Sequence, residues 1–175
     1  MKPKPFKVAY INGYLGLHSN KAQKLKNALQ DMPNIEVYHI PVDFKDGYFD
    51  GQIIDEYLSQ HGIDLIVGSS MGAFVSKYFA HAYNATLISL NPMIDPKASK
   101  NAQNILFDDK FMGSYELRHY IMLNKDDELI PYQDSYALFK DGAVRSFEKG
   151  GHRMSNFETD IIPVIKEIIK EDVIV

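Results

Sequence analysis

Apolar residues along this chain follow two periods, one typical of buried strands and one typical of amphipathic helices. Six short runs rich in β-branched and aromatic residues predict strands. Four of these runs are almost continuously apolar, as expected for strands covered by helices on both faces. The predicted strands are KVAYIN (7 to 12), IEVYHIPV (35 to 42), DLIVGS (64 to 69), ATLISLN (85 to 91), RHYIMLN (118 to 124) and AVRSFE (143 to 148).

Five segments between and after these strands have the spacing of helices: residues 19 to 32, 50 to 62, 71 to 83, 131 to 142 and 157 to 172. Ser19 is expected to cap the first helix, and Pro163 is expected to shift the start of the last one to a later residue. Strands that alternate with helices indicate β-α-β units with right-handed crossovers. The pattern therefore predicts a single α/β domain, residues 1 to 175, with a mainly parallel sheet of about six strands and helices on both faces.

Composition narrows the classes of function. The 175 residues carry 19 basic and 23 acidic side chains, a net charge of -4, without the basic stripe that nucleic-acid binding requires. The chain has no cysteine, which excludes disulfides, thiolate metal sites and a cysteine nucleophile. No signal-peptide core and no apolar run of about 20 residues is present, so we expect a cytoplasmic protein without a membrane partner.

The third predicted strand ends in Gly68-Ser69-Ser70-Met71-Gly72, which matches the G-x-S-x-G pattern of a nucleophile elbow centred on Ser70. Ligand sites of parallel sheets lie at the carboxyl ends of the strands, so chemistry is expected at this position. Gly68 and Gly72 would permit a tight strand-to-helix turn that exposes the Ser70 hydroxyl. A plain glycine-rich turn in which Ser70 caps a helix is the alternative, and the position between a strand and a helix favours the elbow.

Two more strand ends carry residues able to activate a serine. The fifth strand is followed by Asp126, Asp127 and Glu128, any of which could orient a histidine, although a solvated acidic turn accounts for at least one of them. The sixth strand is followed by two glycines that present His152. The other five histidines lie within or beside predicted elements and are expected to be packed or surface residues.

The loop after the first strand, residues 11 to 16, is a candidate for half of an oxyanion hole. In such a hole one backbone N–H comes from the residue after the nucleophile, here Met71, and the other is expected from Tyr14. A plain glycine turn is the alternative for this loop. The order serine, acid, histidine along the chain is the order of the α/β-hydrolases.

The sequence resembles the α/β-hydrolase superfamily and, more narrowly, the small bacterial esterases of the YqiA/YcfP type. The segments that carry the resemblance are YINGYLGLHSNKAQKLKNAL, GSSMGAFVSKYFA, ISLNPMIDP and KDDELIPY, and the match covers most of the chain. The resemblance implies a compact α/β-hydrolase fold with a minimal lid. One departure is Asn12, which stands where the family usually has a histidine; an oxyanion hole made of backbone N–H groups should remain usable.

The resemblance also implies a role for each candidate residue. Ser70 corresponds to the nucleophile and His152 to the base. Asp127 corresponds to the acid because it lies four residues before Pro131, the usual placement in the family. The expected activity is that of a serine hydrolase of the carboxylesterase type, which cleaves small acyl esters through an acyl-enzyme intermediate.

Other aspects of the function are less constrained. We expect no cofactor and no metal, because the histidines lack H-E-x-x-H spacing and the acidic cluster lacks an EF-hand pattern. A thioesterase, or a non-catalytic binding protein with a hydrolase fold, is the alternative. Residues 92 to 117 are too few for a large lid domain, so a short acyl chain is expected. Apolar residues that could line the pocket or belong to the core are Leu15, Met93 and Ile130, with Ile94 and Met154 nearby.

Overall fold

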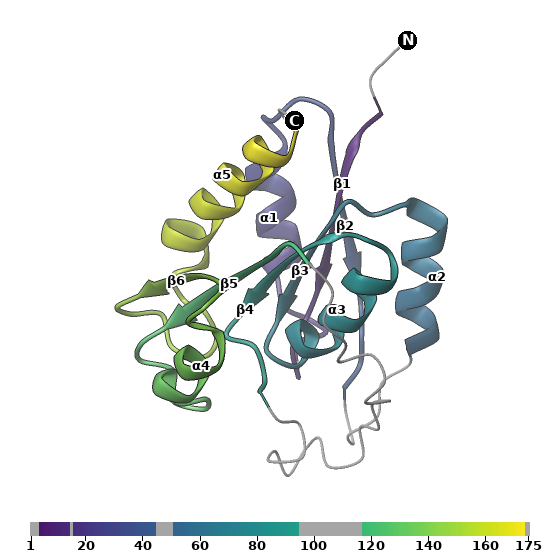
Figure 1. Ribbon diagram of the computed structural model, residues 1–175. Coiled ribbons are helices and arrows are strands. Elements are labelled where there is room, and N and C mark those ends of the chain that lie inside the picture. The colour runs from purple at the N-terminus through teal and green to yellow at the C-terminus, as the bar shows by residue number, and fades with distance from the viewer. Residues whose placement is uncertain (1–3, 15, 45–50, 95–116, 174–175) are drawn as a thin grey trace.

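The computed structural model describes residues 4–14, 16–44, 51–94 and 117–173. Within them a sheet of six parallel strands has helices on both faces (Figure 1). The strands are β1 (Phe6–Ile11), β2 (Ile35–Ile40), β3 (Leu65–Ser69), β4 (Thr86–Leu90), β5 (His119–Asn124) and β6 (Ala143–Phe147). The predicted α/β fold with a parallel sheet is confirmed.

The strand order, β2-β1-β3-β4-β5-β6, places the start of the chain inside the sheet. β2 pairs with one edge of β1, and β3 returns to pair with the other edge, so the direction in which the sheet grows reverses at β1. In open parallel sheets a crevice forms at such a reversal, outside the carboxyl ends of the strands. The loop after β1 and the turn after β3 therefore meet at the expected position of a site.

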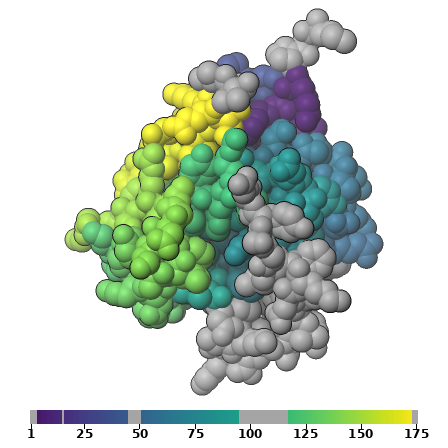
Figure 2. Space-filling model, in the orientation of Figure 1, coloured from purple at the N-terminus to yellow at the C-terminus, as the bar shows by residue number. Residues whose placement is uncertain are grey.

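Two hydrophobic cores lie on opposite faces of the sheet, because successive side chains of a strand point in opposite directions. Val8 and Tyr10 of β1 pack in the core under α1 (Lys21–Leu29) and α5 (Ile162–Val173). Ala9 and Ile11 pack in the other core under α2 (Gly51–His61) and α3 (Met71–Ala82). Figure 2 shows α5, in yellow, beside the purple beginning of the chain, so the end of the chain covers its first strand.

The ends of two helices depend on local chemistry. α1 begins at Lys21 after Asn20, one residue later than a Ser19 cap predicts; the Ser19 hydroxyl accepts a 3.3 Å hydrogen bond from the Lys21 backbone N–H. The last helical segment starts as a π-helical turn, Phe157–Ile161, and α5 follows with Pro163 as its second residue. Proline is tolerated there because first-turn N–H groups have no intrahelical acceptor. The segment is helical from Phe157, so the expected delay holds for its α-helical part alone, which begins at Ile162.

The fourth helix, α4 (Tyr132–Phe139), lies between β5 and β6 in sequence and near the sheet edge that these strands form (Figure 1). β2 and β6 are the edge strands, and among the described strands β5 is the partner of β6. Among the residues that the structure describes, no helix is both long enough and apolar enough to cross a membrane.

Candidate active site

Ser70 stands at the turn between β3 and α3 in a strained backbone conformation. Its φ of 52° and ψ of -115° lie in a region that non-glycine residues rarely adopt and that costs about 1 to 3 kcal/mol. Hydrogen bonds hold the turn: the Ser70 N–H donates to the Leu90 carbonyl oxygen at 2.9 Å, and the Ser70 carbonyl oxygen accepts from Met93 N–H at 3.1 Å. The end of β4 therefore supports the conformation that presents the Ser70 side chain.

At the two elbow glycines there is no space for a side chain. A Cβ at Gly72 would lie 2.2 Å from the Asn12 carbonyl oxygen, and a Cβ at Gly68 would lie 2.6 Å from the Ala73 Cα. Both distances are shorter than real Cβ contacts, so the start of α3 packs directly on the backbone that leaves β1 and on β3 itself. Gly68 and Gly72 are therefore required at these positions because neighbouring backbone approaches each of them too closely for a side chain to fit.

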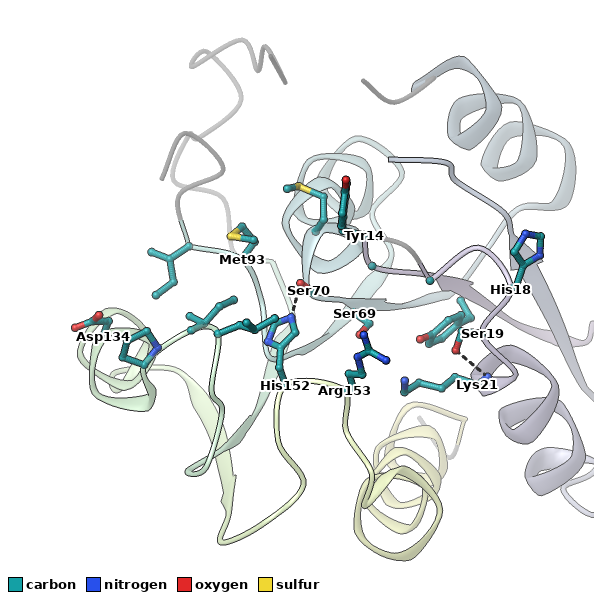
Figure 3. A pocket seen from close by; sticks show the side chains of 18 residues that line it. Tyr14, His18, Ser19, Lys21, Ser69, Ser70, Met93, Asp134, His152 and Arg153 are labelled. Carbon is teal, nitrogen blue, oxygen red and sulfur yellow. Dashed lines mark hydrogen bonds between the residues drawn. The ribbon is translucent and has the colours of Figure 1, made fainter. Parts of the chain in front are cut away.

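Ser70, His152 and Asp127, from three different strand ends, form one chain of hydrogen bonds. The His152 Nε2 lies 2.9 Å from the Ser70 Oγ, as the dashed line in Figure 3 marks. The His152 Nδ1 lies 2.9 Å and 3.1 Å from the two carboxylate oxygens of Asp127. The Asp127 side chain is only 3% exposed and that of His152 11%, so solvent screens their interaction little.

All three neighbouring carboxylates of the acid loop contact the histidine loop. Asp126 accepts hydrogen bonds from the N–H groups of Gly150 and Gly151, the shorter at 2.8 Å, and Glu128 accepts from the His152 N–H at 2.9 Å. These bonds lower the pKa of the Asp126 carboxyl through Gly151 and that of the Glu128 carboxyl through His152. Asp126 and Glu128 are exposed, as the alternative of a solvated acidic turn predicts, and in addition both hold backbone that carries His152.

A cluster of buried asparagines at the carboxyl ends of β4 and β5 supports the loop that carries His152. Asn91 directly follows β4, and Asn124 is the last residue of β5. Each donates a side-chain hydrogen bond of 2.9 Å to the Gly151 carbonyl oxygen. Asn156 completes the cluster through a 3.0 Å bond from its Nδ2 to the Asn124 Oδ1. The three side chains are almost fully buried, so they provide the carbonyl oxygen of Gly151 with partners that water cannot supply.

The predicted oxyanion residues, Tyr14 and Met71, line the same pocket as Ser70. Met71 is the first residue of α3, and its N–H therefore has no acceptor within the helix. Among the described parts of the chain, neither the Met71 nor the Tyr14 N–H donates a hydrogen bond. Asn12 fixes the loop that carries Tyr14, because its amide exchanges bonds of 2.7 Å and 3.1 Å with the backbone of Val42.

The pocket at Ser70 has a volume of about 920 Å³ and two chemically different ends. Met93 marks its apolar end, and Asp134 lies on the same side of Ser70. The apolar residues that line the pocket are Met93, Ile94 and Ile130, which were predicted at the site, together with Leu129 and Pro131. Met154 is 1% exposed in the core between α1 and α5, so for this residue the core alternative is the correct one. Leu15 lies outside the described residues, and so does nearly all of the expected minimal lid, residues 95 to 116.

The other end of the pocket is polar. It is lined by Ser69 and the basic side chains Lys21 and Arg153, and the Tyr10 hydroxyl of β1 forms a side-chain hydrogen bond with Ser69. Burial raises the pKa of Tyr10, and a side-chain hydrogen bond with Ser69 opposes this shift. Ser69 is therefore more than a spacer in the elbow, because its side chain faces the pocket that Ser70 serves.

The sequence does contain a signal for two supporting residues that were not predicted, Asn91 and Asn124. Two buried strands both end in leucine-asparagine, ISLN and IMLN, and both asparagines hold the Gly151 carbonyl oxygen. An asparagine at the inner end of an apolar strand is unusual because burying an amide is costly without partners. No such signal predicts that Lys21 and Arg153 lie close together, since 132 positions separate them in the chain.

Over the described residues, no group of three or more side chains could hold a metal ion.

Comparison with solved structures identifies the fold. A structure of Est1E from Butyrivibrio proteoclasticus with ferulic acid bound matches with a TM-score of 0.76 at 16% identity, over 99% of this chain and 92% of that chain. The esterase domain of a Rhodothermus marinus protein matches at 0.68 and 15%, over 95% and 88%. The ydeN gene product of B. subtilis matches at 0.68 and 16%, over 95% and 97%.

No protein-family model matches the sequence, and no curated protein matches it in a comparison of sequences. The narrower resemblance to YqiA/YcfP-type esterases therefore stays a prediction. The fold that the broader one implies is confirmed by the parallel six-stranded sheet and by structural matches that span nearly the whole of both chains. The chain has the α/β-hydrolase fold.

Proposed function

We propose that this protein is a serine hydrolase that cleaves small acyl esters. The observation that supports the proposal most strongly is the hydrogen-bonded series Ser70 Oγ, His152 Nε2, His152 Nδ1 and Asp127, with 2.9 Å links on both sides of the imidazole. A nucleophile, a base and a buried acid in this order can generate an alkoxide-like oxygen near neutral pH. In the α/β-hydrolase fold, these strand ends are where such chemistry is expected.

In the first half of the proposed reaction, the Ser70 Oγ attacks the ester carbonyl carbon while His152 Nε2 takes the hydroxyl proton. The N–H groups of Met71 and Tyr14 stabilise the negative oxygen of the tetrahedral intermediate. Asp127 accepts a hydrogen bond from Nδ1–H and stabilises the imidazolium. The intermediate collapses when His152 returns the proton to the leaving alcohol, which leaves the acyl group on Ser70.

In the second half, water replaces the alcohol. His152 removes a proton from the water as its oxygen attacks the acyl carbon, and the same two N–H groups stabilise the second intermediate. Transfer of the proton to Ser70 Oγ then breaks the acyl bond and releases the carboxylic acid. The strained backbone at Ser70 contributes by holding its hydroxyl in position before substrate arrives.

The pocket favours a substrate with a modest acyl group. Its volume of about 920 Å³ and its apolar end at Met93, Ile94 and Ile130 fit a short aliphatic or aromatic acyl group. Est1E, which has the same fold, was solved with ferulic acid, an aromatic carboxylic acid of this size. A thioester could react through the same groups, so both bond types belong in the test.

The test measures hydrolysis of a panel of para-nitrophenyl esters and acyl thioesters of increasing chain length. We expect the wild-type protein to turn over short acyl chains, and Ser70→Ala to lower kcat by a factor on the order of 10⁶. Circular dichroism should show that Ser70→Ala is folded. Full turnover by a folded Ser70→Ala protein would refute the proposal.

Covalent labelling provides a second measurement that does not depend on the substrate. A fluorophosphonate probe should label Ser70, and mass spectrometry of the labelled peptide should locate the adduct there. Labelling should persist in Ser69→Ala, the matched change at the neighbouring serine, and should be lost in Ser70→Ala and greatly slowed in His152→Ala. A wild-type protein that is neither labelled nor active would instead favour a binding protein with a hydrolase fold.

A further inference from the structure

Two basic side chains face each other at the polar end of the pocket. Lys21 is the first residue of α1, and Arg153 directly follows His152 in the loop after β6. Both line the pocket that contains Ser70, and Figure 3 shows their side chains directed toward one another on the opposite side of Ser70 from Met93 and Asp134. Asp134, the only acidic residue among the described residues that line the pocket, lies at the far end.

No acid neutralises this pair within the part of the chain that the structure describes. Lys24, one turn after Lys21, forms an ion pair with Glu158 at 2.5 Å, but neither Lys21 nor Arg153 forms one with a described residue. Burial lowers the pKa of Lys21, and the positive charges of Lys24 and Arg153 lower it further. Lys21 is half-buried and Arg153 is exposed, and the two like charges repel each other, a cost that a bound anion would reverse.

Neutral donors surround the same position. The hydroxyl-bearing side chains of Ser19, Ser69 and Tyr10 line this end of the pocket beside the two cations. Carboxylate and phosphate oxygens take several hydrogen bonds at once, and a guanidinium and an ammonium supply charge-assisted ones. The pocket thus combines an apolar end, a reacting centre at Ser70 and a polar end with the chemistry of an anion site.

We propose that Lys21 and Arg153 form a subsite for an anionic group, a carboxylate or a phosphate, carried by the ester that Ser70 cleaves. This inference rests on the proposed function and specifies its substrate class as an anionic ester. The acyl chain occupies the apolar end at Met93 and Ile94, and the anionic group of the alcohol portion lies between Lys21 and Arg153.

The experiment compares esters that differ in charge at one position. The probes are para-(butyryloxy)benzoate, para-(butyryloxy)phenyl phosphate and the neutral para-(butyryloxy)benzamide, and a monoaryl glutarate moves the carboxylate to the acyl side. We expect kcat/KM to be about tenfold or more higher for an anionic probe than for the neutral one. The better of the benzoate and the phosphate identifies the anion, and preference for the glutarate would place the anion on the acyl portion.

Charge-removing variants then assign the preference to residues. In Lys21→Gln and in Arg153→Gln the ratio of anionic to neutral kcat/KM should fall toward one, and Arg153→Lys should keep part of it. Lys26→Gln, an exposed lysine on the same helix, and Arg145→Gln, an exposed arginine of β6, remove the same charges away from the pocket and should keep the wild-type ratio. An equal loss in the control variants would overturn the subsite, because it would indicate a general effect of net charge.

Binding to the inactive Ser70→Ala protein separates this inference from the proposed function. Calorimetry should give a Kd for para-(butyryloxy)benzoate or the phosphate about tenfold below that for the benzamide, and Arg153→Gln in the same background should remove the difference. Turnover of neutral esters without any anionic preference in rate or binding overturns the subsite and retains the hydrolase. Anion-selective binding without any turnover retains the subsite and overturns the hydrolase.

Discussion

The backbone N–H of Asn124 donates a 2.9 Å hydrogen bond to the Oδ1 of Asn91, so a side chain joins the carboxyl ends of β5 and β4. The amide nitrogens of the same two residues both donate to the Gly151 carbonyl oxygen. The residue after Gly151 is His152. The position of the proposed base therefore depends on two strand ends of the sheet as well as on its own loop.

Replacement of Asn124 by alanine should misplace His152 without removing any reacting group. We expect Asn124→Ala to lower kcat by about tenfold to a hundredfold with little change in KM, because small errors in the position of a base are costly. The loss of partners for Asn156 and Gly151 should also lower the free energy of unfolding by about 1 to 3 kcal/mol. Steady-state kinetics and urea denaturation measure the two effects.

Ser155→Ala is the matched control for that variant. It removes a 3.1 Å hydrogen bond from the exposed Ser155 Oγ to the Gly150 carbonyl oxygen in the same loop. Exposed bonds contribute little, so kcat and stability should stay close to the wild-type values. If Asn124→Ala lost stability but kept its kcat, the asparagine cluster would be structural only.

The three acids of the β5 loop should differ sharply in their effect on rate. In Asp127→Asn, the N–H groups of Leu129 and Ile130, which donate to Asp127 Oδ1 at 2.9 Å, would still select the amide oxygen. The amide nitrogen would then face His152 Nδ1 and favour the tautomer with the proton on Nε2. We expect kcat to fall by a factor on the order of 10⁴.

Asp126→Asn and Glu128→Gln are the comparisons for Asp127→Asn, since each removes one charge. Asp126→Asn keeps an oxygen for the Gly151 N–H and loses the longer 3.2 Å bond from the Gly150 N–H, and Glu128→Gln keeps an oxygen for the His152 N–H. Their loss of kcat should be about tenfold or less, because they hold backbone and do not contact the imidazole. Values of kcat for the three variants, measured with the same ester, test which carboxylate acts on His152. Equal losses in all three variants would contradict the assignment of Asp127 as the acid.

Gly72→Ala should disturb both the elbow and the β1 loop. Its Cβ would lie 2.2 Å from the Asn12 carbonyl oxygen, and relief of that overlap requires backbone to move, at about 1 to 3 kcal/mol. We expect a lower Tm together with a large loss of kcat. In Gly142→Ala the Cβ would lie 3.3 Å from the Phe139 carbonyl oxygen, so a much smaller change in Tm is expected from thermal unfolding.

Acid should destabilise the fold partly through His119 of β5. Burial, with a smaller contribution from Lys77, lowers the pKa of His119 from 6.5 to about 4. The unfolded chain therefore takes up a proton below pH 6.5 that the folded chain takes up only near pH 4, and stability falls as the pH falls through that window. The loss is on the order of 3 kcal/mol across the window.

The variant that tests this is His119→Gln, which keeps a polar partner for the Ser89 hydroxyl, 2.7 Å from the His119 Nε2. Urea denaturation of both proteins at pH 7, 6 and 5 gives the slope of stability against pH. The slope should be smaller in His119→Gln. Parallel slopes for the two proteins would show that His119 does not contribute.

The parts of the molecule that could be predicted from sequence are those with a local signal. The strands have continuous apolar runs, and Ser70 is flanked by two glycines between a strand and a helix. His152 follows two glycines at a strand end. Parallel strands bring their carboxyl ends to one edge of the sheet. A local pattern at each strand end was therefore enough to predict that residues far apart in the chain lie close together.

The parts that could not be predicted depend on contacts between distant segments. Asp126 and Glu128 are exposed neighbours of Asp127, and only the path of the Gly150–His152 backbone gives them hydrogen-bond partners. Lys21 and Arg153 reach the same end of the pocket only after α1 and the loop after β6 have packed there. Their spacing in the chain carries no period and no motif.

The close packing of Gly72 against Asn12 separates what is fixed in this site from what is free to vary. The elbow and the β1 loop have no spare volume, whereas Leu129 in the pocket wall is 67% exposed and Arg153 is exposed as well. Changes in these exposed walls would alter which ester is accepted while the reacting groups stay where the sheet holds them. A directed-evolution library confined to such wall positions could therefore explore new substrates while the tightly packed elbow and β1 loop stay unchanged.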